Sequence, residues 1–486
     1  MSSFITAFSA TVPVVRVALL VMTDETKVAK QKRPTDDSAP APKRARASSL
    51  LPSPTAVSLP PPRKPLPPHQ LILAPMVGGS ELAFRLLARR HGAQLCYTPM
   101  IHQDAWPEPG AGVNLLERHV DDCPLVAHFS GDDPQKLLSV AREAERCSGV
   151  VAIDLNLGCP QRSAQSGHFG AYLCDPEDRV LLLRIVSTLA SSLSVPFFCK
   201  IRLLDVLDET LEFVQQLQDA GCALLAVHGR YRGSPMHRRD GPAHLDQIAL
   251  IKQKLSIPVI SNGNVRNGAE LIQALQITGA DGVMTAEGAL DDPAIFSAAI
   301  TLVQSERARL AAEVKCARDL KKAKRDQGRQ LSLEERAMVK RRHEAKARLH
   351  TLPKLRRPPP LSTAVPMPPS NIAGAAGAAG ASPPSSQFDL AEQYLALVEK
   401  FPPPGGDDAL LFHAVFHLRR LCRTPLTEFD LLASLAACTS LDACAGVVRR
   451  CRAHAEGTLE FEGRRRPPSY WRRQQRRGVV LEVVPS

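Results

Sequence analysis

The chain has 486 residues, a net charge of +12, 41 prolines and 5% aromatic residues. It is too long for one ordinary domain and in places too rich in proline to be folded throughout. Its 12 cysteines include no Cys-x-x-Cys pair. Neither a zinc ribbon nor a redox dithiol is therefore indicated, and we expect no metal and a reducing compartment, the nucleus, the cytoplasm or both. No apolar run approaches the roughly 20 residues that span a bilayer, so we expect no membrane contact. We also expect the protein to be a monomer.

The net positive charge lies in the flanks of the chain and not in its middle. Residues 1–70 carry +6, residues 306–357 carry +11 and residues 358–486 carry +2, whereas residues 71–305 carry −7. Because long-range attraction follows the distribution of charge, a bound polyanion is expected to contact mainly the flanks. The acidic middle must supply something other than bulk electrostatics.

Composition and periodicity divide the chain into five regions. In order, we expect a disordered basic N-terminal extension, 1–70; an α/β region, 71–305; a basic helical insertion with a Pro/Ala/Gly linker, 306–386; a small all-helical domain, 387–460; and a basic tail, 461–486. Two basic clusters in the extension, Lys27–Arg33 and Lys43–Arg46, are spaced like a bipartite nuclear import signal, with a solvated arm as the alternative.

Two smaller patterns lie in the insertion and in the tail. Ser332 and Glu335 have the spacing of a capping box, which predicts a helix that begins there. The tail interleaves arginines with Tyr470 and Trp471. This composition can stack on bases and neutralise phosphates, although a merely solvated tail is equally compatible with it.

Short apolar runs alternate with amphipathic ones between residues 71 and 305. The expected strands are Leu71–Met76, Gln94–Pro99, Leu125–Phe129, Val151–Leu157, Phe197–Arg202, Leu224–His228, Val259–Asn262 and Gly282–Thr285. The helical patterns between them are Glu81–Arg90, Pro134–Cys147, Asp178–Ser192, Glu209–Ala220, Ala243–Lys254 and Gly268–Thr278. Eight such units predict a TIM (β/α)8 barrel. A doubly wound open sheet is the alternative, but no Gly-x-Gly-x-x-Gly follows the first strand.

In a TIM barrel, the residues at the C-terminal ends of the strands meet at one mouth, where active sites lie. The candidates at these positions are Pro75, Met76, Val77, His128, Asn156, Cys159, Lys200, Arg202, His228, Arg230, Asn262, Gly263, Asn264, Ala286, Glu287 and Gly288. The small residues after the last two strands suit an anion such as phosphate, although a plain Gly loop is the alternative for each turn alone.

Two side chains of this set have a chemical requirement of their own. Lys200 would be desolvated in the mouth, and this cost needs an anion or a developing negative charge to offset it. Cys159 stands in a polar Gly-Cys-Pro-Gln turn after a strand, where a thiol can react. For the other cysteines near strands, such as Cys96 and Cys199, we prefer the interpretation of a small buried apolar residue.

Six short motifs, in order along the chain, resemble those of the tRNA-dihydrouridine synthases. They are Leu73-Ala74-Pro75-Met76, Asp154-Leu155-Asn156-Leu157-Gly158-Cys159-Pro160, Lys200-Ile201-Arg202, Val227-His228-Gly229-Arg230, Asn262-Gly263-Asn264 and Gly282-Val283-Met284. Two further segments, Gln94–Met100 and Ala286–Gly288, are similar to the eukaryotic branch that acts on adjacent D-loop uridines, positions 16 and 17. The helical region after the linker is similar in placement to the tRNA-binding domain of the family.

The resemblance implies an FMN-bound TIM barrel that reduces the C5–C6 double bond of uridine in tRNA, with NADPH or NADH as reductant. Cys159 would donate the proton to C5, and an ordinary thiol is mostly protonated at neutral pH. Asn156 and Arg202 would hold the uracil, and Lys200 would stabilise the anionic reduced ring. The implied FMN-binding residues are Pro75, Met76, Val77, His128, Lys200, His228, Asn262, Gly263, Asn264, Ala286 and Glu287.

One residue departs from the family pattern. His128 stands where the family usually has a Gln that contacts the flavin ring, and we expect His to donate one hydrogen bond without offering the donor and acceptor of an amide together. Flavin affinity or potential would then change. The alternative function is a catalytically impaired RNA-binding scaffold of the same fold, and a flavin barrel that acts on a small molecule is a third reading.

Overall fold

The computed structural model describes residues 65–106, 115–232, 241–359, 386–463 and 465, all within one unit, Pro60–Ser486. The predictions for the N-terminal extension up to residue 64, most of the Pro/Ala/Gly linker and the tail from residue 466 lie outside these residues. No helix among the described residues is both long and apolar enough to cross a membrane.

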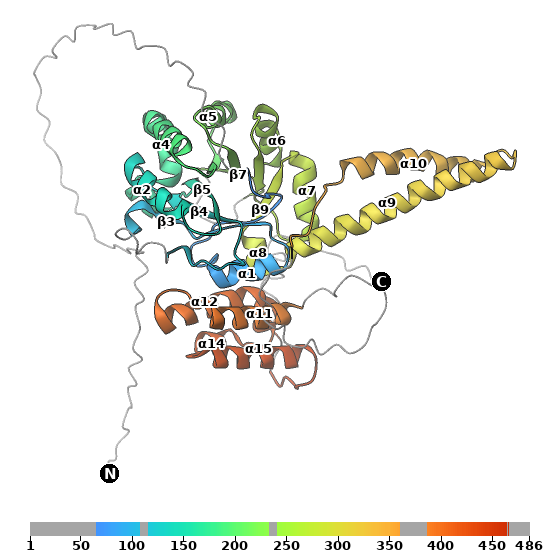
Figure 1. Ribbon diagram of the computed structural model, residues 1–486. Helices are drawn as coiled ribbons and strands as arrows, with labels where there is room; N and C mark the ends of the chain where they lie inside the picture. Colours follow the sequence, from blue (N-terminus) through green and yellow to red (C-terminus); the bar gives the residue numbers. More distant parts are fainter. Residues whose placement is uncertain (1–64, 107–114, 233–240, 360–385, 464, 466–486) are drawn as a thin grey trace, which may run out of the picture. The chain divides into compact units, whose positions relative to one another are not determined.

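Eight parallel strands close into a barrel, which confirms the predicted TIM fold (Figure 1). They are β1 (Leu71–Leu73), β2 (Leu95–Tyr97), β4 (Leu125–Ser130), β5 (Val150–Leu157), β6 (Phe197–Leu203), β7 (Leu224–Tyr231), β8 (Val259–Asn262) and β9 (Gly282–Thr285). The barrel closes because β1 pairs with both β2 and β9, and β2 also pairs with β4. A two-residue strand, β3 (Ile101–His102), pairs with the end of β4.

The strand bounds differ from the predicted ones mainly at the C-terminal ends. β8 and β9 coincide with their predictions. β1 stops at Leu73 instead of Met76, because the next residues turn away: the Ser80 hydroxyl hydrogen bonds to the backbone N–H and C=O of Met76. β7 continues three residues past the predicted end at His228. β2 also stops short, at Tyr97 instead of Pro99, whereas β4 and β6 each continue one residue past the prediction.

Helices surround the strands, as the alternating sequence pattern predicts (Figure 1). They are α1 (Leu82–Arg90), α2 (Pro134–Glu145), α3 (Arg162–Ser166), α4 (Arg179–Ser192), α5 (Leu207–Asp219), α6 (Leu245–Lys254), α7 (Gly268–Thr278) and α8 (Glu287–Asp291), with 3-10 turns at Gln103–Ala105, Gly170–Cys174 and Pro176–Asp178. Local caps set several boundaries: the Asp133 carboxylate accepts from the backbone of Gln135 and Lys136 at the start of α2, and Asn267 caps α7.

The barrel interior is apolar at one end and polar at the other. Its apolar part is a cluster of buried side chains: Ile72, Ala74, Leu95, Tyr97, Val126, Ala152, Phe198, Leu224, Ala226, Ile260 and Met284. Because side chains alternate along a strand, the next inward positions after Val126, Ala152 and Phe198 are His128, Asp154 and Lys200. The polar layer therefore begins just below the C-terminal mouth.

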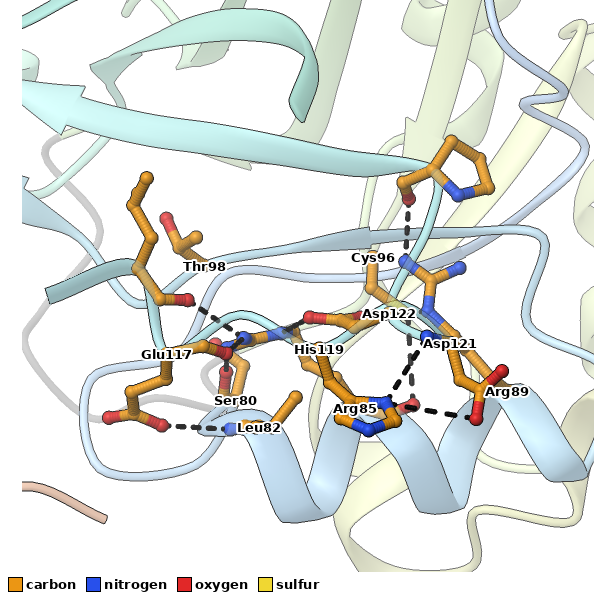
Figure 2. Close-up of polar contacts among 12 residues, drawn as sticks. Ser80, Leu82, Arg85, Arg89, Cys96, Thr98, Glu117, His119, Asp121 and Asp122 are labelled. Carbon is orange, nitrogen blue, oxygen red and sulfur yellow. Dashed lines mark hydrogen bonds and ion pairs between the residues drawn. The ribbon is translucent and has the colours of Figure 1, made fainter. Parts of the chain in front are cut away.

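A buried ionic cluster attaches α1 to the barrel (Figure 2). The Asp122 carboxylate accepts from Nε of Arg85 at 2.7 Å and from Nε of Arg89 at 2.8 Å. Arg85 is fully buried, and its remaining donors bond the carbonyls of Ser80, Leu116 and Glu117. Each buried charge is thus paired and hydrogen-bonded, which offsets the cost of removing it from water.

Two long helices form a hairpin that follows the barrel (Figure 1, yellow and orange). They are α9 (Ile295–Asp326) and α10 (Leu333–Thr351). The predicted boundary at residue 305 lies inside α9, so the last barrel helix and the basic insertion are one continuous element. The capping box of Ser332 and Glu335 is confirmed, because each bonds the backbone N–H of the other.

The region after the linker is all-helical (Figure 1, orange to red). Its helices are α11 (Gln387–Lys400), α12 (Gly406–Leu421), α13 (Arg423–Glu428), α14 (Leu432–Ala436) and α15 (Leu441–Ala455). Its contact with the barrel includes a buried polar junction around Glu81, the residue before α1. The Glu81 carboxylate accepts from the Tyr394 hydroxyl at 2.8 Å and lies 3.1 Å from Nε2 of His417.

Candidate active site

Cys159 lies in a turn that is fixed by the side chain of Asn156. The turn follows the end of β5, and the Asn156 Oδ1 atom accepts from the backbone N–H of Gly158 at 3.0 Å and of Cys159 at 2.9 Å. The Gly158 carbonyl accepts from Nε of Arg202 on β6 at 2.9 Å. Cys159 itself remains partly exposed. The thiol is thus held at a defined place and is still accessible.

The other side of the turn packs against Gly170. The backbone N–H of Ala171 donates to the Cys159 carbonyl at 3.1 Å. Gly170 has φ +66, and a Cβ atom there would lie 3.0 Å from the Cys159 Cβ and carbonyl oxygen. Both the conformation and the close approach favour glycine. The sequence did not predict this role of Gly170, because a glycine shortly after a polar helix does not indicate which residue it will contact.

His128 lies in the polar layer, and both of its ring nitrogens contact protein groups. Nδ1 lies 2.6 Å from Oδ2 of Asp154, and Nε2 lies 3.0 Å from Nδ2 of Asn156. The expectation that His cannot offer a donor and an acceptor together is therefore wrong, because a neutral imidazole has one of each on its two nitrogens. The contact predicted for His128 is with a flavin ring. In this arrangement, neither of its nitrogens is free to make that contact.

Three cationic side chains gather at the mouth. Lys200 and Arg202 lie on β6, and Arg230 lies near the end of β7. Within the described part of the chain, none of the three has a carboxylate partner. Burial and, to a smaller extent, the nearby Arg202 lower the pKa of Lys200 to about 8, against a weaker opposing effect of Asp154. Such a site is deficient in negative charge and favours an anionic ligand.

His228 belongs to the same cluster and is held neutral. Burial lowers its pKa well below the ordinary value, and Lys200, Arg202 and Arg230 lower it further. Its Nε2 atom lies 2.9 Å from Nη1 of Arg230, so Nε2 acts as the acceptor. Nη2 of Arg230 donates to Oδ1 of Asn264 at 2.9 Å, which connects β7 to the turn after β8.

The turn after β8 has the backbone shape that the sequence suggested for an anion loop. Gly263 and Asn264 both have positive φ, +121 and +60. A Cβ on Gly263 would lie 2.8 Å from the Cβ of Ala243 and 3.3 Å from the ring of His228. Asn262 is buried and uses its Nδ2 atom for the Met284 carbonyl at 2.9 Å. Asn262 therefore anchors the turn to β9, and the Asn264 side chain contacts the guanidinium of Arg230.

The turn after β9 contacts α12 of the C-terminal helical region. Ala286 is the residue before α8, and Glu287 is its first residue. Nη1 of Arg420 on α12 lies 2.8 Å from Oε2 of Glu287, and Nη2 donates to the Glu287 carbonyl at 3.0 Å. The predicted cofactor role of Glu287 rests on its backbone, because its side chain contacts Arg420. Pro75 and Met76 are half-buried, and Val77 is 69% exposed at the end of β1.

The structure thus brings together the predicted Cys159, Lys200, Arg202, His228 and Asn264. The prediction placed Arg230 at the mouth without a role of its own, and it missed Asp154 and Gly170. Asp154 has a signal in hindsight: period two along β5 places it on the inward face with Asn156. Among the described residues, metal-type donors of Glu81, His413 and His417 lie within 4.8 Å of one another, but at the helical junction and not at the mouth.

The residues of the mouth fit a phosphate-bearing anionic cofactor. Lys200, Arg202 and Arg230 provide three positive charges that form no ion pair with a carboxylate of the described residues, and the positive-φ turn at Gly263 and Asn264 lies beside Arg230. A closed α/β barrel with a thiol and three cations at its C-terminal mouth defines the class of this protein as a TIM-barrel enzyme.

The comparisons place the chain within that class. The model of the dihydrouridine synthase (Dus) family matches residues 72–355, and the chain belongs to this family. A tRNA-dihydrouridine(16/17) synthase (NAD(P)(+))-like protein of Mus musculus is 43% identical over 231 residues, covering 46% of this chain and 47% of that protein. The Saccharomyces cerevisiae tRNA-dihydrouridine(16/17) synthase (NAD(P)(+)) is 37% identical over 240 residues, covering 46% and 54%.

A relative with a different named position is also similar. The Homo sapiens tRNA-dihydrouridine(20a/20b) synthase (NAD(P)+)-like protein is 38% identical over 230 residues, covering 46% of this chain and 70% of that protein. The chain spans about half the length of the first curated relatives that it matches.

Proposed function

We propose that this chain reduces the C5–C6 double bond of a D-loop uridine in tRNA, at position 16 or 17, with FMN as cofactor and NADPH or NADH as reductant. The observation that carries the proposal is the partly exposed Cys159 in a mouth with three cations that have no carboxylate partner among the described residues. Membership of the Dus family and the names of the relatives support it.

In this proposal, the protein donates a proton to the substrate and stabilises negative charge in the mouth. When bound and reduced by NADPH or NADH, FMN would supply a hydride for C6 of the uracil. Cys159 gives its Sγ proton to C5, so that hydride and proton together form the saturated ring, and the thiolate regains a proton from water. Lys200 stabilises negative charge in the mouth. Arg202 holds the Gly158 carbonyl and so keeps the thiol at the place where C5 must arrive.

The cofactor would be held at two ends. Arg230, Asn264 and the Gly263 backbone suit a phosphate, because a cation and a positive-φ turn lie together there. Lys200 suits the electron-rich edge of the flavin ring. His228 accepts from Arg230 through Nε2, so it orients that guanidinium toward an anion instead of adding a charge of its own.

The basic hairpin of α9 and α10 supports a polyanionic substrate. Several exposed basic residues of the hairpin have no acidic partner among the described residues: Lys315, Arg318, Lys321, Lys322, Lys340 and Arg341. Phosphate groups of RNA are the ligands that such a surface attracts. We propose that the hairpin contacts the tRNA while the mouth receives the uridine.

The function is tested by incubating the full-length protein with FMN, NADPH and unmodified tRNA transcript, and by measuring dihydrouridine with mass spectrometry. Dihydrouridine should form only with reductant and flavin. Replacing uridines 16 and 17 of the transcript by cytidine should abolish it, whereas replacement of uridines 20a and 20b should not. A protein that binds tRNA but neither retains FMN nor forms product would instead support the scaffold alternative.

A further inference from the structure

A continuous hydrogen-bonded chain runs from a buried carboxylate to the backbone of Cys159. It begins at Asp154, passes through His128 and then Asn156, and ends at the backbone N–H groups of Gly158 and Cys159. Its four distances lie between 2.6 and 3.0 Å. Asp154 and His128 are almost completely buried, at 0% and 1% exposed, so water does not replace these contacts.

The direction of each hydrogen bond follows from the Cys159 end. The two backbone N–H groups are donors, so the Asn156 atom that they contact must be the carbonyl oxygen Oδ1. The amide nitrogen Nδ2 of Asn156 then faces Nε2 of His128 and can only donate. Nε2 must therefore be the acceptor, and the ring proton resides on Nδ1, which donates to Asp154. Only the neutral Nδ1–H form of His128 satisfies every contact.

We propose that His128 is a positioning residue for Cys159: by bridging Asp154 and Asn156, it holds the Asn156 amide in the one orientation that fixes the Gly158–Cys159 turn. Asp154 holds the ring in turn. Without the acceptor on His128, Nδ2 of Asn156 keeps only Sδ of Met100 at 3.2 Å among its contacts in the described residues. Because a thioether sulfur is a weak acceptor, the amide is then held less firmly. The two backbone N–H groups would then lose Oδ1, and the thiol would no longer have a fixed place.

Two neighbours complete the environment of the ring. The backbone N–H of His128 donates to the Thr98 hydroxyl at 3.0 Å, and the Tyr97 ring packs edge-on with its centroid 6.0 Å from that of His128. Lys200 is the cation that interacts electrostatically with Asp154. These contacts keep the imidazole plane in place, so the bridge depends on the two nitrogens and not on ring packing alone.

The proposal is tested through the reactivity of the thiol, measured without tRNA or reductant. The full-length protein is treated with iodoacetamide, and alkylation of the Cys159 peptide is followed by mass spectrometry, with the exposed Cys123 and Cys316 as internal controls. In His128→Leu, alkylation of Cys159 should rise by about threefold or more, because a released turn exposes the thiol, while Cys123 and Cys316 keep their rates. An unchanged rate at Cys159 would overturn the proposal.

Two further variants separate positioning from simple loss of structure. His128→Gln keeps both a donor and an acceptor and should restore the wild-type alkylation rate; a Gln variant that alkylates as fast as the Leu variant would contradict the bridge. The double variant His128→Leu/Asp154→Leu removes the buried carboxylate together with the ring, so no carboxylate is left buried without its hydrogen-bond partner if His128→Leu alone does not fold. It should show the same rise at Cys159.

The consequence for turnover rests on the proposed function. His128→Leu should lower kcat roughly ten- to a hundredfold with little change in KM for tRNA, since a misplaced proton donor affects the chemical step more than substrate binding. If the wild-type protein forms no dihydrouridine while the alkylation rates change as expected, the proposed function fails and the positioning role stands. If product forms and His128→Leu leaves both kcat and alkylation unchanged, the positioning role fails alone.

Discussion

Cys159 combines accessibility with a rigid backbone, and this combination suits a proton donor. Asn156 fixes its N–H, Ala171 fixes its carbonyl, and Gly170 allows the close approach. The thiol is left as the free end of the turn. A proton donor needs such a place, because proton transfer requires a short and aligned approach to the acceptor carbon.

Replacing Cys159 by Ala should therefore remove product without removing the cofactor. The Ala side chain keeps the turn, since the contacts of residue 159 are made by its backbone. We expect dihydrouridine formation to fall by roughly a hundredfold or more, in line with the loss of a general acid, while the flavin absorbance of the purified protein stays the same. Dihydrouridine yields equal to those of the wild type would exclude Cys159 as the donor.

Lys200 should make cofactor binding depend on pH. Its folded pKa is about 8, so the side chain is cationic below that pH and becomes neutral above it. Because an anionic ligand favours the charged form, FMN affinity should weaken as the pH rises through about 8. The measurement is the FMN dissociation constant by fluorescence from pH 6.5 to 9.5. Lys200→Arg stays charged and should bind with little dependence on pH, whereas a wild-type affinity that is flat across this range would contradict the assignment.

At the scale of elements, the junction at Glu81 couples α1 of the barrel to α11 and α12. Burial raises the pKa of the Glu81 carboxyl, but His417 and His413 outweigh that effect and hold it well below its usual value. Burial lowers the pKa of His413, but Glu81 outweighs it and the net shift is upward. The junction therefore consists of a buried carboxylate that contacts the Tyr394 hydroxyl and Nε2 of His417 at hydrogen-bond distance, with Nδ1 of His413 at 3.5 Å.

The stability of the protein should depend on this junction and on pH. A lowered carboxyl pKa contributes stability above the unfolded value of about 4.3, lost as pH falls further. A raised His pKa contributes below about 6.5, lost as pH rises past the folded value. Glu81→Gln should lower the free energy of unfolding by roughly 1.5–3 kcal/mol at pH 6. As the pH falls, the variant should lose less stability than the wild type. Urea unfolding from pH 2 to 8 measures both the stability at pH 6 and the loss toward acid pH; parallel profiles of the variant and the wild type would argue against the junction.

The hairpin of α9 and α10 should bind tRNA through its unpaired cations. Lys315→Gln, Arg318→Gln and Lys322→Gln together remove charges of one helix face, because three- and four-residue steps align on a helix. The slope of log affinity against log salt should decrease by about 2–3. The matched control neutralises Arg309, Lys324 and Arg348, which are paired with Glu306 and Glu335. Filter binding between 50 and 300 mM salt compares them; equal effects would assign binding to net charge alone.

At the scale of the whole molecule, local charge and overall charge have opposite signs. Residues 71–305 carry −7, yet the mouth of the same region gathers Lys200, Arg202 and Arg230 without carboxylate partners in the described part of the chain. Asp154 lies just below the mouth, whereas other acidic residues of the barrel lie away from it, for example Asp133 at the start of α2 and Glu209 on α5. A folded cofactor site can thus oppose the charge of the domain that contains it.

Binding of FMN should stabilise the folded chain through these cations. A ligand at about 100 times its dissociation constant adds about 2.7 kcal/mol, which corresponds to a rise in Tm of roughly 5–10 °C for a domain of this size. Thermal unfolding followed by circular dichroism, with and without FMN, measures the shift. In Lys200→Met the shift should be smaller at the same FMN concentration, and a wild-type Tm that does not respond to FMN would contradict cofactor binding at the mouth.

Local patterns in the sequence were sufficient for the barrel and for the position of its mouth. The bounds of β8, β9 and α7 follow from apolar runs and helical periodicity, and the capping box of Ser332 and Glu335 follows from a spacing of three residues. The sequence signals for these features lie within a few residues of one another, although the strands pair with partners far along the chain. The sequence therefore determines the fold class, the strand after which Cys159 lies, and the family motifs.

Only the tertiary structure decided which groups meet. His128 and Asp154 are 26 residues apart, Arg230 and Asn264 are 34 apart, and Tyr394 lies 313 residues after Glu81. No local pattern encodes such pairs, because their distance depends on closure of the barrel and on packing of the C-terminal helices against it. The sequence by itself placed a thiol and a histidine at the ends of neighbouring strands; closure of the barrel made the histidine a support for the turn that carries the thiol.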